Sequence, residues 1–155
     1  MSLKQQLQDR VYDSFPHRPN HTTYAGLSQG CKDIERLIDA NPDDPRWDWI
    51  YVSFNPYITT AFIERYIHKL RHITGLSAHP SLSWDIVRGN PEKYWDFYGL
   101  TMNPSIPWEI IEAHPELPWH YRPLGMSPKI TYDTILAHPE LPWDYQYISQ
   151  HPNLT

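Results

Sequence analysis

The sequence predicts an all-α protein, built as a solenoid-like array of short helix pairs. Three observations support this prediction. A segment of 24 residues recurs along the chain, apolar residues within each copy recur at helical spacing, and a proline stands where each helix has to end. A fixed period of this length indicates a stacked array, in which each copy contacts mainly its neighbours.

About five copies of this repeat follow one another. The first copy has one extra residue, and after the fifth copy the chain begins another one. The predicted boundaries of repeats 1 to 5 and of the final stub are 30–54, 55–78, 79–102, 103–126, 127–150 and 151–155. Residues 1–29 precede the array, and we expect them to form an N-terminal cap or a decayed repeat, because the ends of an array need a polar outer face.

The first half of each repeat predicts a short helix. We expect Thr59, Ser83 and Thr131 to cap its N-terminus, and Pro107, which takes the same position in repeat 4, to lie in the first helical turn. In three repeats an acidic residue follows, and its negative charge interacts favourably with the positive end of the helix dipole. These acids are Asp85, Glu109 and Asp133. The helix should end at the residue before the next proline, which avoids the α conformation.

The second half predicts another helix, with Pro118 and Trp119 in its first turn in repeat 4. Each helix would have roughly seven or eight residues, too few for stability alone, since isolated helices need about 12–15 residues. Stability should therefore come from aromatic residues that pack on those of the neighbouring repeats. The predicted core aromatics are Trp47, Trp84, Trp95, Trp108, Trp119, Tyr132 and Trp143.

Composition limits the classes of function. The 155 residues carry a formal net charge of −5, which argues against nucleic-acid binding over the whole surface. Cys31 is the only cysteine, so an internal disulfide and a cysteine-based zinc site are excluded. No apolar run approaches the roughly 20 residues of a membrane helix, and the N-terminus has no apolar signal core. We therefore expect a soluble protein that is not secreted.

Repeat 2 departs from the pattern, because it lacks the internal proline and has Arg71 where other repeats have tryptophan. The sequence predicts one long helix, capped by Thr59, that runs to about Thr74 and ends at Gly75. Its basic residues could form a cationic patch for phosphate, nucleic acid or an acidic protein, or simply a solvated helix face. The candidate patch comprises Arg65, His68, Lys69, Arg71, His72 and Lys93.

Chemical motifs are scarce. Four of the nine histidines precede proline at junctions where other repeats have Asn or Ser, so we interpret them as residues that hydrogen-bond the turn backbone rather than as metal ligands. No nucleophile motif and no glycine-rich phosphate loop is present. We expect no catalytic, cofactor-binding or metal-binding residues and no enzymatic activity. A strand alternative stays open for the alternating aromatics, although hairpin turn signals are absent.

The repeat has the form Asn/His-Pro-x-Ile/Leu-Thr/Ser-Trp-Asp/Glu, followed by Asn/His-Pro-Glu-x-Pro-Trp-Asp-Tyr. It is carried by residues 79–101, 103–125 and 127–149, and more loosely by 41–53. This pattern resembles the Trp- and Pro-rich repeats of giant DNA virus proteins, of the mimivirus-like and marseillevirus-like groups. The resemblance implies a viral protein that acts inside an infected host cell, in the cytoplasm or nucleus, with packaging in the virion as a further expectation. It implies no catalytic residue.

Together these features predict a non-enzymatic interaction module that binds a host or viral protein, because repeat arrays present extended surfaces to partners. Affinity would come from a few aromatic or Arg anchors. The alternative is a module that binds nucleic acid or phosphate through the basic helix around residues 65–72. A homodimer through the C-terminal end is a further hypothesis.

Overall fold

The computed structural model describes Ser28 and residues 30–151. The chain divides into two compact units, Met1–His72 and Ile73–Thr155, and each is described by itself. The predicted cap before Ser28 and the stub after His151 lie outside the described residues. Within the described residues there are ten helices and no strand, so the all-α prediction is confirmed and the strand alternative is wrong.

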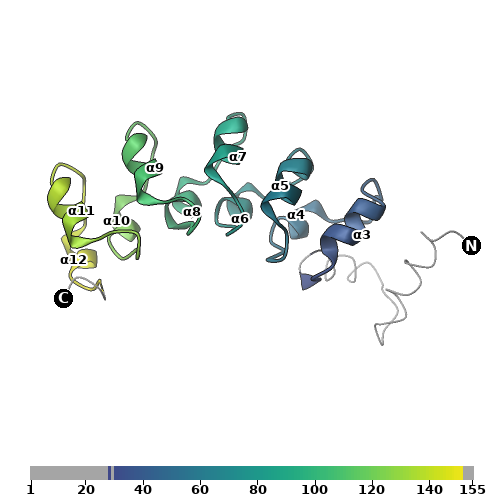
Figure 1. Ribbon diagram of the computed structural model, residues 1–155, viewed down its shortest axis with the longest axis horizontal. Coiled ribbons are helices and arrows are strands. Elements are labelled where there is room, and N and C mark those ends of the chain that lie inside the picture. The colour runs from purple at the N-terminus through teal and green to yellow at the C-terminus, as the bar shows by residue number, and fades with distance from the viewer. Residues whose placement is uncertain (1–27, 29, 152–155) are drawn as a thin grey trace, which may run out of the picture. The chain divides into compact units, whose positions relative to one another are not determined.

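The helices have four to seven residues, somewhat fewer than the seven or eight that the sequence predicts. The described part of the first unit contains α3 (Ile34–Ala40), α4 (Trp49–Val52) and α5 (Thr60–Tyr66). The second unit contains α6 (Ile73–Ser77), α7 (Trp84–Gly89), α8 (Phe97–Met102), α9 (Trp108–Ala113), α10 (Tyr121–Leu124), α11 (Tyr132–Ala137) and α12 (Tyr145–Ile148). In the second unit, α7, α9 and α11 lie along one side and α6, α8, α10 and α12 along the other (Figure 1).

The predicted caps of the first helices are confirmed. The hydroxyl groups of Thr59, Ser83 and Thr131 each accept a hydrogen bond from the backbone N–H three residues later, at 3.3, 3.4 and 3.2 Å. The helices of repeats 3 to 5 end, as predicted, at the residue before proline. These C-cap residues, each directly after the last residue of its helix, are Asn90, His114 and His138.

Pro107 differs from the prediction, since it is the N-cap residue of α9 and not part of its first turn. Its backbone is extended, with φ −74° and ψ 167°, and it offers no side-chain hydrogen bond to the helix. Proline suits this position because its ring fixes φ near the observed value, and the missing N–H is not needed before a helix begins.

In repeats 3 to 5, the second helix begins later than predicted. Asp96 and Asp144 are N-caps, with their carboxylates accepting backbone N–H groups of α8 and α12. The preceding tryptophans therefore lie outside the helices. The indole N–H of Trp119 instead donates to the carbonyl oxygen of His114 at 2.8 Å, which closes the turn between the two helices. The same bond, at 2.7 to 3.0 Å, is made by Trp47, Trp95 and Trp143.

The long helix predicted in repeat 2 is wrong. Helix α5 ends at Tyr66, and the backbone is no longer helical from Leu70 through His72. Two contacts within the first unit explain the break. Leu70 is buried, and the N–H of His72 donates to the hydroxyl of Ser53 at 3.3 Å. Packing thus imposes the break without a proline.

The largest fully buried side chains of the second unit are aliphatic. They include Leu82, Leu100, Ile106, Ile111 and Leu124. Of the predicted core aromatics, Trp119 and Trp143 are 6% and 7% exposed, whereas Trp47, Trp84, Trp95 and Trp108 are half-buried. Tyr132 is 60% exposed and therefore does not belong to the core of the described residues.

The residues that open repeats 2 to 5 hydrogen-bond the following turn, as the sequence predicts. Asn103 accepts the N–H of Ser105 at 2.8 Å, and His79 accepts that of Ser81 at 3.1 Å. The same side chains also join repeats, which the sequence did not predict. The amide of Asn103 donates to the carbonyl oxygens of Ser77 and His79, at 2.8 and 2.9 Å. Asn55 makes the equivalent bonds within the first unit.

Repeat 5 opens with Ser127, whose side chain is too short to reach the preceding repeat in this way. A lysine two residues later supplies the donor. The ammonium group of Lys129 donates to the carbonyl oxygen of Thr101 at 2.8 Å, the oxygen equivalent to that of Ser77 one repeat earlier. Burial lowers the pKa of Lys129 to about 8.

Candidate protein-binding surfaces

The cationic patch predicted around α5 is partly neutralised by carboxylates of the preceding repeat. The guanidinium group of Arg65 lies 2.7 Å from the carboxylate of Asp39. The ammonium group of Lys69 lies 2.6 Å from the carboxylate of Asp43 and 2.8 Å from the carbonyl oxygen of Pro42. Two of the predicted cations are therefore engaged in joining repeats.

Each of these ion pairs shifts the pKa of one partner in the expected direction. The hydrogen bond from Lys69 lowers the pKa of the Asp43 carboxyl below its ordinary value, and the hydrogen bond to Asp39 raises the pKa of Arg65. Both pairs are exposed, so salt screens them and their contribution to stability is small. Lys69 also lies 5.3 Å from the ring centre of Trp49.

The other members of the patch have different surroundings. His68 and Arg71 are exposed, and the ring of His72 packs on that of Phe54 at 4.3 Å. Lys93 belongs to the second unit. The cationic patch stays a prediction, but a phosphate group would have to compete with Asp39 and Asp43 for its two paired cations.

A second surface, which the sequence did not predict, consists of exposed apolar side chains on the second helices or just after them. In the second unit they form what we call the apolar row, defined as Tyr98, Met102 and Met126. Tyr98 is 54% exposed, and its ring meets that of His120 edge-on at 5.5 Å. Helices α8 and α10 pack against each other. Tyr98 and Met102 belong to α8, and Met126 lies two residues after the end of α10 in the next repeat.

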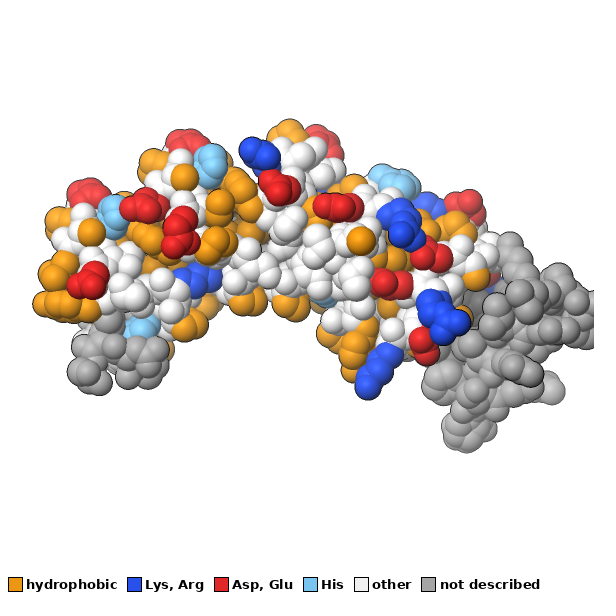
Figure 2. All heavy atoms as spheres, in the orientation of Figure 1, with side chains coloured by type: hydrophobic (Ala, Val, Ile, Leu, Met, Phe, Trp, Pro, Cys, Tyr) orange, Lys and Arg blue, Asp and Glu red, His pale blue; other side chains and the backbone are white. Residues whose placement is uncertain are grey.

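The first unit repeats this feature with Ile50 and Phe54, which are also exposed. These positions lie three and seven residues after the second-half tryptophan, the same intervals that separate Tyr98 and Met102 from Trp95. The signal was available in the sequence as apolar residues that fall outside the buried positions of the repeat. Figure 2 shows hydrophobic side chains exposed on the visible face of the second unit.

The two buried tryptophans of the second unit share one aromatic setting. Trp119 packs against Trp84 and Phe97 of the preceding repeat, with ring centres 5.9 and 5.2 Å apart. Trp143 packs against Trp108 and Tyr121 in the same way, at 6.0 and 5.8 Å. Each indole is therefore held between an aromatic residue of a first helix and one of a second helix. Such pairs add to the stability gained by burial alone.

Within residues 30–151 no three His, Cys, Asp or Glu side chains come together in a way that could hold a metal ion. Among the helices described here, none has both the length and the apolar character needed to cross a membrane. Comparison of the chain with models of protein families, with curated proteins and with solved structures finds no match.

Proposed function

We propose that this chain is a non-enzymatic repeat module that binds a protein partner, and that it is a viral protein whose partner is a host or viral protein. The viral part of the proposal is supported only by the resemblance of the repeat to those of giant DNA virus proteins. The binding part is supported by the surface.

One observation carries the binding proposal. Large apolar side chains stay exposed at repeat-equivalent positions, as Tyr98 and Met102 in the second unit and as Ile50 and Phe54 in the first. Contiguous exposed apolar side chains mark interaction sites, and aromatic residues are frequent anchors at protein interfaces. Because the helices that carry them are fixed by inter-repeat contacts, such a surface is ordered before a partner binds.

The experiment is affinity capture with the full chain, compared with a Tyr98→Ser/Met126→Ser variant. We expect the variant to lose the captured protein while its unfolding temperature stays close to that of the wild type, since both side chains are exposed. Tyr94→Ser is the matched control, because Tyr94 is 95% exposed and lies outside the apolar row. Equal capture by all three proteins would contradict the assignment of this surface.

A further inference from the structure

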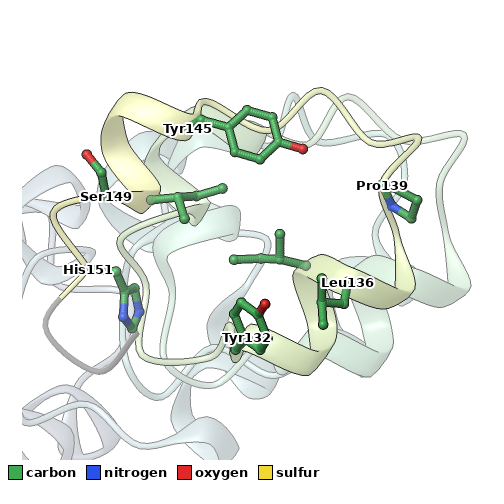
Figure 3. A pocket seen from close by; sticks show the side chains of 8 residues that line it. Tyr132, Leu136, Pro139, Tyr145, Ser149 and His151 are labelled. Atoms are coloured by element: carbon green, nitrogen blue, oxygen red, sulfur yellow. The ribbon is translucent and has the colours of Figure 1, made fainter. Parts of the chain in front are cut away.

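The aromatic setting of Trp119 and Trp143 recurs a third time, around Tyr132 and Tyr145. Each buried tryptophan follows its first-helix partner by 35 residues and its second-helix partner by 22. Tyr132 and Tyr145 are the next pair in this register, 24 residues after Trp108 and Tyr121. A pocket of about 330 Å³ lies between them, and the two rings stand on opposite sides of it (Figure 3).

The wall of this pocket, which we call the tyrosine pocket, is mainly apolar. It is lined by Tyr132, Ile135, Leu136, Pro139, Tyr145, Ile148, Ser149 and His151. Tyr132, Leu136 and Tyr145 are each about 60% exposed. Its volume is in the range of clefts that bind ligands, roughly 300–1,000 Å³. Three large apolar side chains left exposed around one hollow indicate a binding site.

We propose that the tyrosine pocket binds the indole ring of a tryptophan from a partner protein, carried in a segment of the form His-Pro-x-x-Pro-Trp. The inference rests on the proposed function in one respect, that the partner is a protein. The occupant is read from the two filled copies of the site, in which the ring of Trp119 or Trp143 takes the equivalent place.

The turn that carries the tryptophan explains why a mainly apolar pocket is sufficient to bind an indole ring despite its polar N–H group. In both filled copies the indole N–H is satisfied within its own segment, by the carbonyl oxygen of the His five residues earlier. That His also packs on the first-helix aromatic, as His114 does on Trp84 at 5.1 Å. A partner segment of this form brings its own acceptor, and its His ring would pack on Tyr132.

A different protein is a better source of this segment than a second copy of the chain. Trp119 and Trp143 are buried in their own repeats, so a second copy would have to unpack one of them before offering it. Loss of that packing would oppose association. A segment from another protein carries no such cost.

The test is a titration of the full chain, with methyl groups of Ile and Leu labelled for NMR, by a synthetic peptide with the sequence of residues 137–148. We expect saturable shifts at Ile135, Leu136 and Ile148, with a Kd on the order of 0.1–1 mM, because a short peptide must be ordered on binding. A peptide with alanine in place of its tryptophan should bind at least about tenfold more weakly, since the indole supplies most of the buried area.

Chain variants make the result specific. Leu136→Asp and Tyr132→Ser change exposed side chains, so both should keep the unfolding temperature of the wild type and lose the peptide. Tyr94→Ser should bind it normally. The inference is overturned by an absence of methyl shifts up to about 5 mM peptide, by shifts confined to other residues, or by equal binding of the alanine peptide.

Self-association that Leu136→Asp abolishes, without peptide binding, would assign the tyrosine pocket to a second copy and would also overturn the inference. The proposed function can be judged separately, because it predicts capture of a protein that depends on Tyr98 and Met126. Loss of peptide binding alone leaves that capture unchanged.

Discussion

The backbone N–H of Asp96 donates a hydrogen bond of 3.0 Å to the hydroxyl of Ser77, which is fully buried and lies 19 residues earlier. The same hydroxyl donates to the carbonyl oxygen of Ile73 at 2.8 Å. The side chain of Ser77 thus bonds the backbone of its own helix, α6, and also holds the residue that begins α8 in the next repeat. Thr101 makes the equivalent bond to the N–H of His120.

Replacing Ser77 by alanine should therefore destabilise the second unit. The N–H of Asp96 would be left without its partner in a partly buried place, which costs about 1–3 kcal/mol. Ser149 is the matched control, because it takes the same position in repeat 5 but is exposed. Ser149→Ala should cost less than about 0.5 kcal/mol, as surface substitutions usually do. Urea unfolding measures both, and equal losses would show that the inter-repeat bond contributes nothing.

Trp119 offers a second test of how the repeats are held together. Trp119→Ala removes a buried indole from between Trp84 and Phe97 and should lower the free energy of unfolding by roughly 3–5 kcal/mol. Trp119→Phe keeps an aromatic ring but loses the bond to His114, so its loss should be smaller. Tyr94→Ala, at an exposed position, is the control. A change in melting temperature of Trp119→Ala as small as that of the control would contradict the role of this tryptophan in the core.

Much of the fold could be predicted because its signals are local. A capping residue such as Ser83 and a proline after Asn90 act within a few residues, and the 24-residue period repeats them. The break after Tyr66 could not be predicted this way. It depends on the burial of Leu70 and on the hydroxyl of Ser53, from the preceding repeat, and neither effect is visible within the segment itself.

The candidate surfaces, too, could be predicted only where their signals are local in the sequence. The sequence predicts the cations Arg65 and Lys69 but not their neutralisation, because Asp39 and Asp43 lie 26 residues earlier. That interval is only one or two residues longer than one period, so each acid lies close to the position one repeat before its partner. The tyrosine pocket was missed because Tyr132 was counted as core by analogy with Trp108.

Lys129, which joins repeat 5 to Thr101 of repeat 3, gives the protein a pH dependence in the alkaline range. The pKa of Lys129 is about 8 in the folded chain, below its ordinary value of 10.5. Between these pH values the unfolded chain binds more protons than the folded chain, so stability should rise as pH increases from about 8 toward 10. Below pH 8 Lys129 is protonated in both the folded and the unfolded chain, so it adds no pH dependence to the stability there.

Urea unfolding at pH values of about 7.5 and 9.5 measures this effect. It is the difference between the wild type and Lys129→Met in how much the free energy of unfolding changes over this pH interval. Other groups contribute to both proteins alike, so the wild type should gain more stability than Lys129→Met over this interval. Lys93→Met is the control and should gain as much as the wild type. A pH response of Lys129→Met equal to that of the wild type would contradict the assignment.

The paired cations Arg65 and Lys69 distinguish a protein-binding module from one that binds nucleic acid. Asp39 and Asp43 neutralise Arg65 and Lys69, so the wild type should be retained only weakly on immobilised heparin. Asp39→Asn/Asp43→Asn keeps the shape of both side chains and frees both cations, and it should elute at higher salt. The converse charge change, Arg65→Gln/Lys69→Gln, should scarcely alter the retention of the wild type. Two results together would replace the proposed function by the nucleic-acid alternative. The first is binding of DNA or RNA by the wild type at low salt, with log Kd changing by about 0.9 per phosphate contact for each tenfold change in salt. The second is loss of that binding in Arg65→Gln/Lys69→Gln.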